Sequence, residues 1–167
     1  SWVRIAAAEV TGYATSVIAC DAEAGVEKFL SPAESPDGRP GVSLMFFAFG
    51  QSALEKAVSN RVGQCILTCP TTACYSGYTP EDPEKNIALG SQLRFFGDGF
   101  QVSKKWGDRR LWRVPVMDGE FVCEDQTGTF KGVAGGNLLI CATDQKSGLL
   151  ATEAAVSAMQ QVDFFFF

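Results

Sequence analysis

The stretch GVSLMFFAFGQSALEKAVSNRVGQCILTC (Gly41–Cys69) decides the fold. Its nearly unbroken apolar run, Val42–Phe49, predicts a central strand that is covered on both faces. In Gln51–Val62 the apolar residues recur at i, i+3, i+4 and i+8, which predicts an amphipathic helix. Gly63 is expected to end this helix, and Gln64–Cys69 is expected to return as a strand.

The segments on either side of this stretch also contain predicted helices and strands. Trp2–Tyr13 and Lys146–Val162 have the apolar spacing of helices, and Thr15–Cys20 is a short apolar strand candidate. Pro70–Asn86 contains three prolines and predicts a long loop, of a length that is often functional or mobile. Leu93–Thr143 is rich in strand formers and tight turns. Its three hairpin signals are Gly107-Asp108, Asp118-Gly119 and Thr127-Gly128. Helices with antiparallel strands predict an α+β fold.

The amino-acid composition argues against some classes of function. The 167 residues fit one domain, and 46% apolar with 20% charged residues is ordinary for a globular protein. A net charge of −5 argues against a nucleic-acid partner, because binding to phosphate backbones depends on a basic surface. No apolar run approaches the ~20 residues of a membrane span, and no basic leader is visible, so no membrane association is expected.

The chain contains six cysteines and no histidine. The absence of histidine excludes Ser-His-Asp and Cys-His catalysis, and neither a phosphate-binding loop nor a dinucleotide fingerprint occurs. The cysteines lie mostly among apolar neighbours, and the only cluster lacks a fourth ligand for zinc. We therefore expect reduced buried thiols, no metal site and a cytoplasmic location. The six are Cys20, Cys65, Cys69, Cys74, Cys123 and Cys141.

The chain contains four turns rich in acidic residues and glycine. Each of them, taken singly, could be an ordinary hairpin loop. They are SPDGRPG (Ser35–Gly41), FFGDGF (Phe95–Phe100), VPVMDGEF (Val114–Phe121) and GVAGGN (Gly132–Asn137). Together with TGYATSVIAC (Thr11–Cys20) and RVGQCILTCPTTA (Arg61–Ala73), their order and wording resemble formylmethanofuran–tetrahydromethanopterin formyltransferases. The resemblance runs from Trp2 to about Val162 and is closer to bacterial forms.

The resemblance implies an enzyme that moves a formyl group reversibly between formylmethanofuran and N5 of tetrahydromethanopterin, without metal or nucleotide. It further implies a ferredoxin-like lobe with an additional antiparallel β-hairpin region. Residues 1–162 would be the N-terminal (proximal) lobe, and residues 163–167 an unreliable truncated end. The main catalytic carboxylate would then lie in an absent second lobe, and this fragment alone would be inactive. The expected partners are the two coenzymes and further copies of the chain, with hydrolase-complex subunits in bacterial forms.

Within this half, Asp98 and Glu120 are the candidate catalytic residues, because each stands between glycine and aromatic residues where burial would favour the protonated form. The alternative roles are a turn cap and a hairpin ion pair. The candidate substrate-binding residues offer backbone groups or hydroxyls in turns, although the last three could instead form a β-bulge. They are Pro70, Thr71, Thr72, Gly97, Gly99, Gly135, Gly136 and Asn137.

Three further groups have competing interpretations. Asp37 and Arg39 are expected to lock their turn as an ion pair rather than to bind a ligand. A basic cluster is a solvated hairpin tip or a docking site for the anionic coenzyme tails. It comprises Lys104, Lys105, Arg109, Arg110 and Arg113. An aromatic set is core or subunit interface, or supplies a ring that stacks on a pterin. It comprises Phe95, Phe96, Phe100, Trp106, Trp112 and Phe121.

Two functions other than catalysis stay open at this point. The chain could be a non-catalytic subunit or scaffold lobe of a formyltransferase/hydrolase complex, or a small-molecule-binding ferredoxin-like domain. An intact second lobe in the gene favours the enzyme, and a natural stop near Phe167 favours the others.

Overall fold

The computed structural model describes residues 2–13, 20–117, 119–133 and 138–162. The chain divides into two compact units, Ser1–Lys131 and Gly132–Phe167. The first unit carries every element but the last helix. No helix among the described residues is both long enough and apolar enough to cross a membrane.

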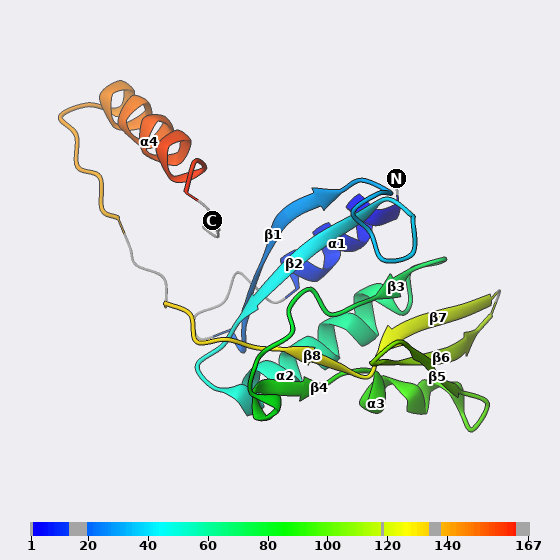
Figure 1. Cartoon of the computed structure of the whole chain (residues 1–167). Helices are drawn as coiled ribbons and strands as arrows, with labels where there is room; N and C mark the ends of the chain where they lie inside the picture. Colours follow the sequence, from blue (N-terminus) through cyan, green and yellow to red (C-terminus); the bar gives the residue numbers. More distant parts are fainter. Residues whose placement is uncertain (1, 14–19, 118, 134–137, 163–167) are drawn as a thin grey trace. The chain divides into compact units, whose positions relative to one another are not determined.

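In the first unit, helix α1 (Trp2–Gly12) packs on a hairpin of β1 (Glu23–Leu30) and β2 (Gly41–Phe47) (Figure 1). The predicted helix is confirmed, and Ala6, Ala7 and Val10 are buried on it. The strands pair antiparallel with a bulge between Val26 and Lys28. The sequence did not reveal β1, because the bulge interrupts the two-residue period. The predicted strand at Thr15–Cys20 lies outside the described residues except for Cys20.

The predicted helix after β2 is confirmed as α2 (Gln51–Arg61), with Ala57, Val58 and then Val62 buried on one face. The prediction that Gly63 ends it and that a strand follows is wrong. The chain continues as the π-helix η1 (Val62–Ile66). Gly63 is buried, and a Cβ there would lie 3.1 Å from Cδ2 of Leu93, so this glycine permits close packing rather than a stop.

A four-stranded sheet forms the centre of the first unit, in the order β3-β7-β6-β5. The strands are β3 (Ala73–Cys74), β5 (Val102–Trp106), β6 (Arg109–Val116) and β7 (Gly119–Glu124). The pairs β5–β6 and β6–β7 are antiparallel, whereas β3 joins the edge of β7 in parallel. The hairpin signal at Gly107-Asp108 is confirmed, because it falls between β5 and β6. Of the signal at Asp118-Gly119, Gly119 begins β7, and Asp118 lies outside the described residues.

Short elements precede or follow the longer strands of this sheet in the chain. They are η2 (Pro83–Lys85), β4 (Asn86–Ala88), α3 (Gly90–Leu93), η3 (Arg94–Gly97) and β8 (Gln126–Gly128). Strands β4 and β8 pair antiparallel as a separate two-stranded sheet. Thr127-Gly128 therefore belongs to a strand and is not the predicted hairpin turn.

The hydrophobic core lies between α2 with η1 and one face of the four-stranded sheet. Its buried members are Val58, Val62, Ile87, Leu89, Leu93, Val114, Phe121 and Cys123. The opposite face of the sheet carries the odd-numbered residues of β6, and these side chains are mostly polar or exposed. The mixed helices and sheets confirm the α+β class.

The second unit contains α4 (Gln145–Met159). Its N-cap is Asp144, whose carboxylate accepts a hydrogen bond from the Ser147 N–H at 2.9 Å. The predicted helix is confirmed, with its end at Met159 instead of Val162. None of the residues of α4 is buried.

Candidate functional site at one end of the sheet

Several predicted site residues lie at the end of the four-stranded sheet where β6 ends and β7 begins. Because β3 and β7 are parallel and Ala73 pairs with Val122, the segment entering β3 lies beside the start of β7. A Cβ added to Gly97 would lie 3.3 Å from Cδ of Pro115, and Pro115 pairs with Glu120. We call this set the sheet-end site. It comprises Pro70, Thr71, Thr72, Gly97, Asp98, Gly99 and Glu120. Gly135, Gly136 and Asn137 lie outside the described residues.

Asp98 stands in a left-handed turn directly after η3, with φ 48° and ψ 41°. Its side chain is exposed, so the expected burial between glycine and aromatic residues is wrong. The main-chain N–H groups here are already used: that of Asp98 donates to Phe95 O at 3.2 Å, and that of Gly99 donates to Gln101 Oε1 at 3.0 Å. The carboxylate of Asp98 is therefore the group that this turn offers to a ligand.

The two glycines beside Asp98 have different structural roles. Gly97 is buried, and a Cβ there would lie 2.9 Å from the side chain of Gln101, so only glycine fits. Gly99 has open space around it but a φ of +91°, a conformation that other residues rarely adopt. Both glycines thus fix the turn that presents Asp98.

Glu120 is also exposed rather than buried, and it forms an ion pair with Arg113 across the β6–β7 hairpin. Arg113 Nε donates to Glu120 Oε2 at 2.7 Å, and Nη2 donates to the same oxygen at 2.5 Å. The hairpin ion pair that the sequence left open as an alternative is therefore present. It fixes the orientation of the Glu120 carboxylate.

Pro70, Thr71 and Thr72 follow the turn after η1, not the strand end that was expected. The Thr72 hydroxyl donates to the main-chain oxygens of Ile66, at 2.5 Å, and Cys69, at 2.9 Å. Thr71 has a φ of 60°, which is unusual for a β-branched residue. Its main-chain oxygen accepts a hydrogen bond from Arg39 Nη1. Thr72 is thus a structural cap, and Thr71 is held in a strained conformation at the sheet end.

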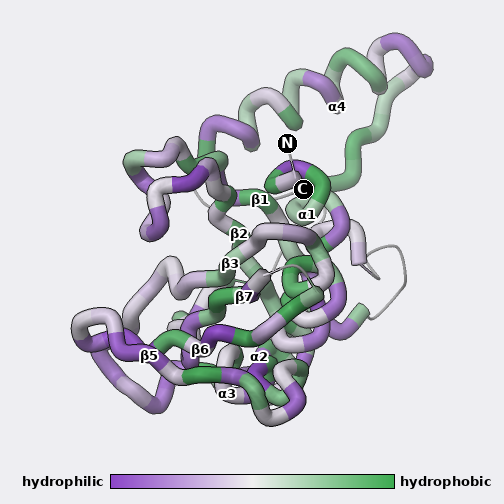
Figure 2. Tube along the Cα trace, turned by 90° about the vertical axis from the view of Figure 1, so that its right-hand side faces the viewer, coloured by the Kyte–Doolittle hydropathy of each residue, from purple (hydrophilic) through white to green (hydrophobic). Residues whose placement is uncertain are grey.

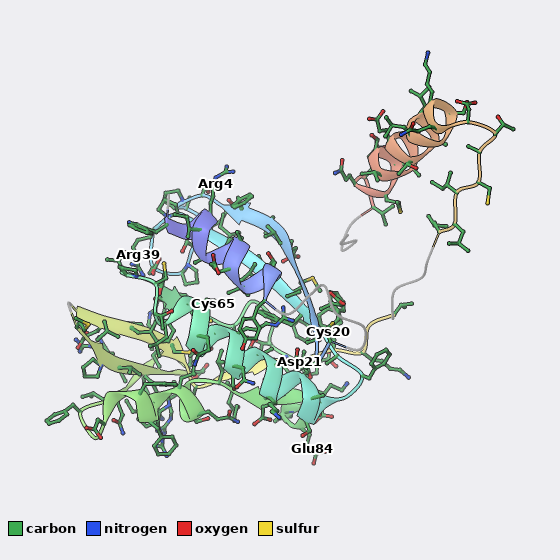
Figure 3. All side chains as sticks on the ribbon, turned by 180° about the vertical axis from the view of Figure 1, so that it is seen from behind. Arg4, Cys20, Asp21, Arg39, Cys65 and Glu84 are labelled. Carbon is green, nitrogen blue, oxygen red and sulfur yellow. The ribbon has the colours of Figure 1, made fainter. Side chains whose placement is uncertain are left out.

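The Asp37–Arg39 ion pair predicted from the sequence is confirmed at 2.6 Å. Burial tends to raise the pKa of Asp37, but hydrogen bonds from Arg39 and Ser35 outweigh it and hold the pKa below its ordinary value. Tyr75 Oη also donates to Asp37, at 3.3 Å. Arg39, labelled in Figure 3, therefore holds its turn against Thr71 and the edge strand β3.

Sequence reasoning missed a polar network centred on Ser76, just past β3. The Ser76 N–H donates to Glu124 Oε2 at 2.7 Å, and its hydroxyl donates to Tyr78 O at 2.7 Å. The Thr127 hydroxyl donates to Ser76 Oγ at 3.2 Å. Ser76 gave no sequence signal, because serine in a loop is commonplace and its partners are distant in sequence.

Arg109 completes this network. Its Nε donates to Glu124 Oε1 at 2.7 Å, its Nη2 forms an ion pair with Oε2, and Nη2 also reaches Ser76 O at 3.2 Å. The Glu124 side chain is only 10% exposed. The hydrogen bond to Glu124 raises the pKa of Arg109. The guanidinium lies 6.0 Å from the Tyr75 ring centroid and 5.9 Å from that of Trp106.

The predicted basic cluster therefore divides. Arg109 and Arg113 are engaged in ion pairs, and Arg110 Nη1 donates to Ser103 Oγ at 3.3 Å. Lys104 and Lys105 are exposed on β5, and neither pairs with an acid among the described residues. Figure 2 shows hydrophilic residues along β5 and in the turn that follows it. Most of the cluster stabilises the sheet.

The aromatic set divides as well. Phe121 is in the core at 2% exposure, and Arg94 lies 4.7 Å above the Trp112 ring. Phe95, Phe96 and Phe100 surround the Asp98 turn and are exposed. All six cysteines are free thiols, and no group of three metal-binding side chains occurs among the described residues.

Comparison with known proteins shows the family. The model of formylmethanofuran–tetrahydromethanopterin formyltransferase matches residues 1–116, and the model described as the proximal lobe of this enzyme matches residues 119–166. The chain belongs to the formylmethanofuran–tetrahydromethanopterin formyltransferase family. The two matched regions meet in the β6–β7 turn, inside the four-stranded sheet.

Similar curated formyltransferases occur in bacteria and archaea. The chain is 53% identical to that of Methylococcus capsulatus over 96% of its length, and 48% identical to that of Methanosarcina acetivorans over 97%. It covers 53% and 54% of those proteins, so it spans about half the length of the curated relatives that it matches.

Solved structures agree with this assignment. The crystal structure of the formyltransferase/hydrolase complex from Methylorubrum extorquens with methylofuran matches with a TM-score of 0.87 and 49% identity, over 97% of this chain and 54% of that one. The formyltransferase from Methanosarcina barkeri matches with a TM-score of 0.78 and 47% identity, over 93% of this chain and 52% of that one.

Proposed function

We propose that the protein carrying this chain transfers a formyl group reversibly between formylmethanofuran and N5 of tetrahydromethanopterin. The observation that carries the proposal is the match to a solved relative, which extends over 97% of the chain at 49% identity with a TM-score of 0.87. Sequence and backbone thus agree along nearly the whole chain with proteins named for this reaction.

The chemistry sets three requirements. The ring nitrogen that attacks the formyl carbon must be held within ~3–3.5 Å of it. Hydrogen-bond donors must face the oxyanion of the tetrahedral intermediate. An acid must protonate the departing amine. None of these steps needs a redox group, so both coenzymes serve as substrates.

We assign Asp98 and Glu120 to this reaction as the carboxylates of the sheet-end site. The ion pair with Arg113 keeps the Glu120 carboxylate in one orientation, which suits it to hold an amine by hydrogen bonding rather than to donate a proton. Asp98 projects from a rigid turn and has no side-chain hydrogen-bond partner among the described residues, so it is available to the departing amine. Gly97 and Gly99 shape this turn, and Pro70, Thr71 and Thr72 border the coenzyme on the opposite side.

The remaining features of the proposal come from the family resemblance. Residues 1–162 form one ferredoxin-like lobe of a two-lobed protein, and Gly135, Gly136 and Asn137 border the coenzyme. The protein assembles with further copies of itself in the cytoplasm, and its six cysteines are free thiols.

The test is a formyl-transfer assay of the protein at the length its gene encodes, with both coenzymes supplied. We expect turnover in the unmodified protein and at least a tenfold loss of kcat/KM in Asp98→Asn and in Glu120→Gln. Asp108→Asn, in the exposed turn between β5 and β6, is the matched control and retains activity. No formyl transfer by the unmodified protein would contradict the proposed function, whereas unchanged variants in an active protein would contradict only the residue assignment.

One alternative has an observation in its favour. Among the similar proteins is a component of a formyltransferase/hydrolase complex from Methylorubrum extorquens, 51% identical to this chain. A scaffold lobe in such an assembly would hold partner subunits without transferring formyl groups. Co-purification of hydrolase subunits with an inactive protein would favour this alternative over the enzyme.

A further inference from the structure

Two cysteines face each other across the only parallel strand pair of the four-stranded sheet. Cys74 of β3 and Cys123 of β7 are register partners. Partners in register point to the same face of a sheet, and neighbouring strands lie ~4.8 Å apart. A disulfide accepts Cα separations of about 4.4–6.8 Å. The backbone therefore already holds this pair at a separation that a disulfide can span.

We propose that Cys74 and Cys123 form a reversible redox pair, in which peroxide oxidation joins the edge strand β3 covalently to β7. This site is independent of formyl transfer, and it uses thiols that the proposed reaction leaves unused.

The two thiols are close but unequal. A hydrogen bond with Cys74 and complete burial raise the pKa of Cys123 well above its ordinary value. Cys74 is only half-buried, and it belongs to a two-residue strand at the edge of the sheet. Oxidant therefore reaches Cys74 first, and Cys123 is the partner that responds from inside the core.

The chemistry balances without any further reactant. The Cys74 thiol releases its proton, and the thiolate attacks one oxygen of hydrogen peroxide, which breaks the O–O bond and gives the sulfenic acid of Cys74 and hydroxide. The hydroxide takes up the released proton and becomes one water. The sulfur of Cys123 then displaces the sulfenic oxygen, which leaves as a second water. Two thiols are oxidised to one disulfide, and one peroxide is reduced to two waters. A dithiol reductant reverses the step.

The bond would act on a segment with few other restraints. Strand β3 pairs through only Ala73 and Cys74. Thr71 precedes it, and Ser76 follows it with its hydrogen bond to Glu124. The disulfide would hold this edge strand against β7. After reduction, only hydrogen bonds would hold it there.

Mass spectrometry tests the proposal directly on the protein at its natural length. Folded protein is treated with hydrogen peroxide, its remaining thiols are blocked with N-ethylmaleimide, and it is digested with trypsin. We expect a cross-link between the peptides Val62–Lys85 and Val114–Lys131, two hydrogen atoms lighter than their sum and cleaved by dithiothreitol.

The first peptide also contains Cys65 and Cys69, which supply matched controls. The cross-link should disappear in Cys74→Ser and persist in Cys65→Ser and Cys69→Ser, all of which leave the buried Cys123 intact. A cross-link that persists in Cys74→Ser, or that forms only after denaturation, would overturn the proposal. Oxidation of Cys74 to higher acids with Cys123 still blocked by N-ethylmaleimide would overturn it as well.

Discussion

The guanidinium of Arg61 donates a hydrogen bond to the main-chain oxygen of Val10, 3.1 Å away. A second bond runs to Ala22 O, and Asp21 Oδ1 lies 3.8 Å from Nη2 (Figure 3 labels Asp21). Arg61 thereby joins the last turn of α2 to the end of α1 and to the start of β1. Its side chain is completely buried, and its hydrogen bonds go to main-chain carbonyls, whereas its acid partner Asp21 is half-exposed.

Replacing Arg61 with methionine should therefore destabilise the protein strongly. Arg61→Met leaves two carbonyl oxygens without their donor, and an unpaired buried acceptor costs ~1–3 kcal/mol. We expect the free energy of unfolding to fall by about 2–5 kcal/mol in urea titration. Arg110→Met, at an exposed arginine, should change it by less than about 0.5 kcal/mol. Equal effects of the two substitutions would show that Arg61 is not a structural anchor.

The two glutamates of β7 should differ in their contribution to stability. Glu124→Gln removes a carboxylate that is 10% exposed and that binds both Arg109 and the Ser76 N–H, so we expect a loss of about 2 kcal/mol. Glu120→Gln breaks a pair whose side chains are 43% and 45% exposed, and such surface pairs contribute at most ~1 kcal/mol. Chemical denaturation of both variants measures the difference, and a larger loss for Glu120→Gln would refute this ranking.

Acid should weaken the turn held by Asp37. Its folded-state pKa lies below the ordinary value of 3.8, so the ionised form favours the folded state. This contribution is fully present above about pH 4, and it is lost as the pH falls through the folded-state pKa. Asp37→Asn should accordingly be less stable than the unmodified protein at pH 6, and the difference should shrink below pH 4. A difference that grows on acidification would contradict the assigned sign.

Gly128 should tolerate no side chain. A Cβ at this residue would overlap the main-chain oxygen of Tyr78 and lie 2.5 Å from Cδ of Pro80. We expect Gly128→Ala to cost about 2 kcal/mol or more, because backbone on β8 and in the adjoining loop must shift. Gly12→Ala is the control, since a Cβ there meets nothing within 4 Å. Thermal melting of both variants checks this, and a Gly128→Ala protein as stable as the control would disprove the close approach.

Asp98→Asn should separate structure from catalysis. Asparagine adopts left-handed turn conformations as readily as aspartate, so the melting temperature should change by less than about 2 °C. If the carboxylate acts on the departing amine, kcat/KM should fall about tenfold or more, which corresponds to ~1.4 kcal/mol of transition-state stabilisation. A lowered melting temperature with normal activity per folded molecule would assign Asp98 to the turn alone.

The helices were predictable from the sequence because the spacing of their apolar residues is typical of helices. Ala6, Ala7 and Val10 of α1 are buried as the pattern requires, and Asp144 caps α4. Glycine was the main source of error. Gly63 resembles a helix stop in sequence, but its neighbours Leu93 and Phe96 arrive from a distant segment and pack against it. Local sequence does not contain that contact.

For the candidate residues, local turn geometry was more predictable than the environment of the side chains. Turn chemistry predicted the turn at Asp98 and the Asp37–Arg39 pair, which depend on nearby residues. The exposure of Asp98 and the pairing of Glu120 with Arg113 depend on which strands are neighbours. The Ser76 network could not be found by any local rule, because Glu124 is 48 residues away.

Strand β5 is an outer strand of the four-stranded sheet, and all five of its residues are exposed. An open strand of this kind offers unpaired main-chain groups to any other extended chain, and lysines along it oppose such pairing. Lys104 and Lys105 thus act as a charge barrier against self-association and fibre formation. Acetylation of both would remove that barrier while leaving the ion pairs of Arg109 and Arg113 unchanged.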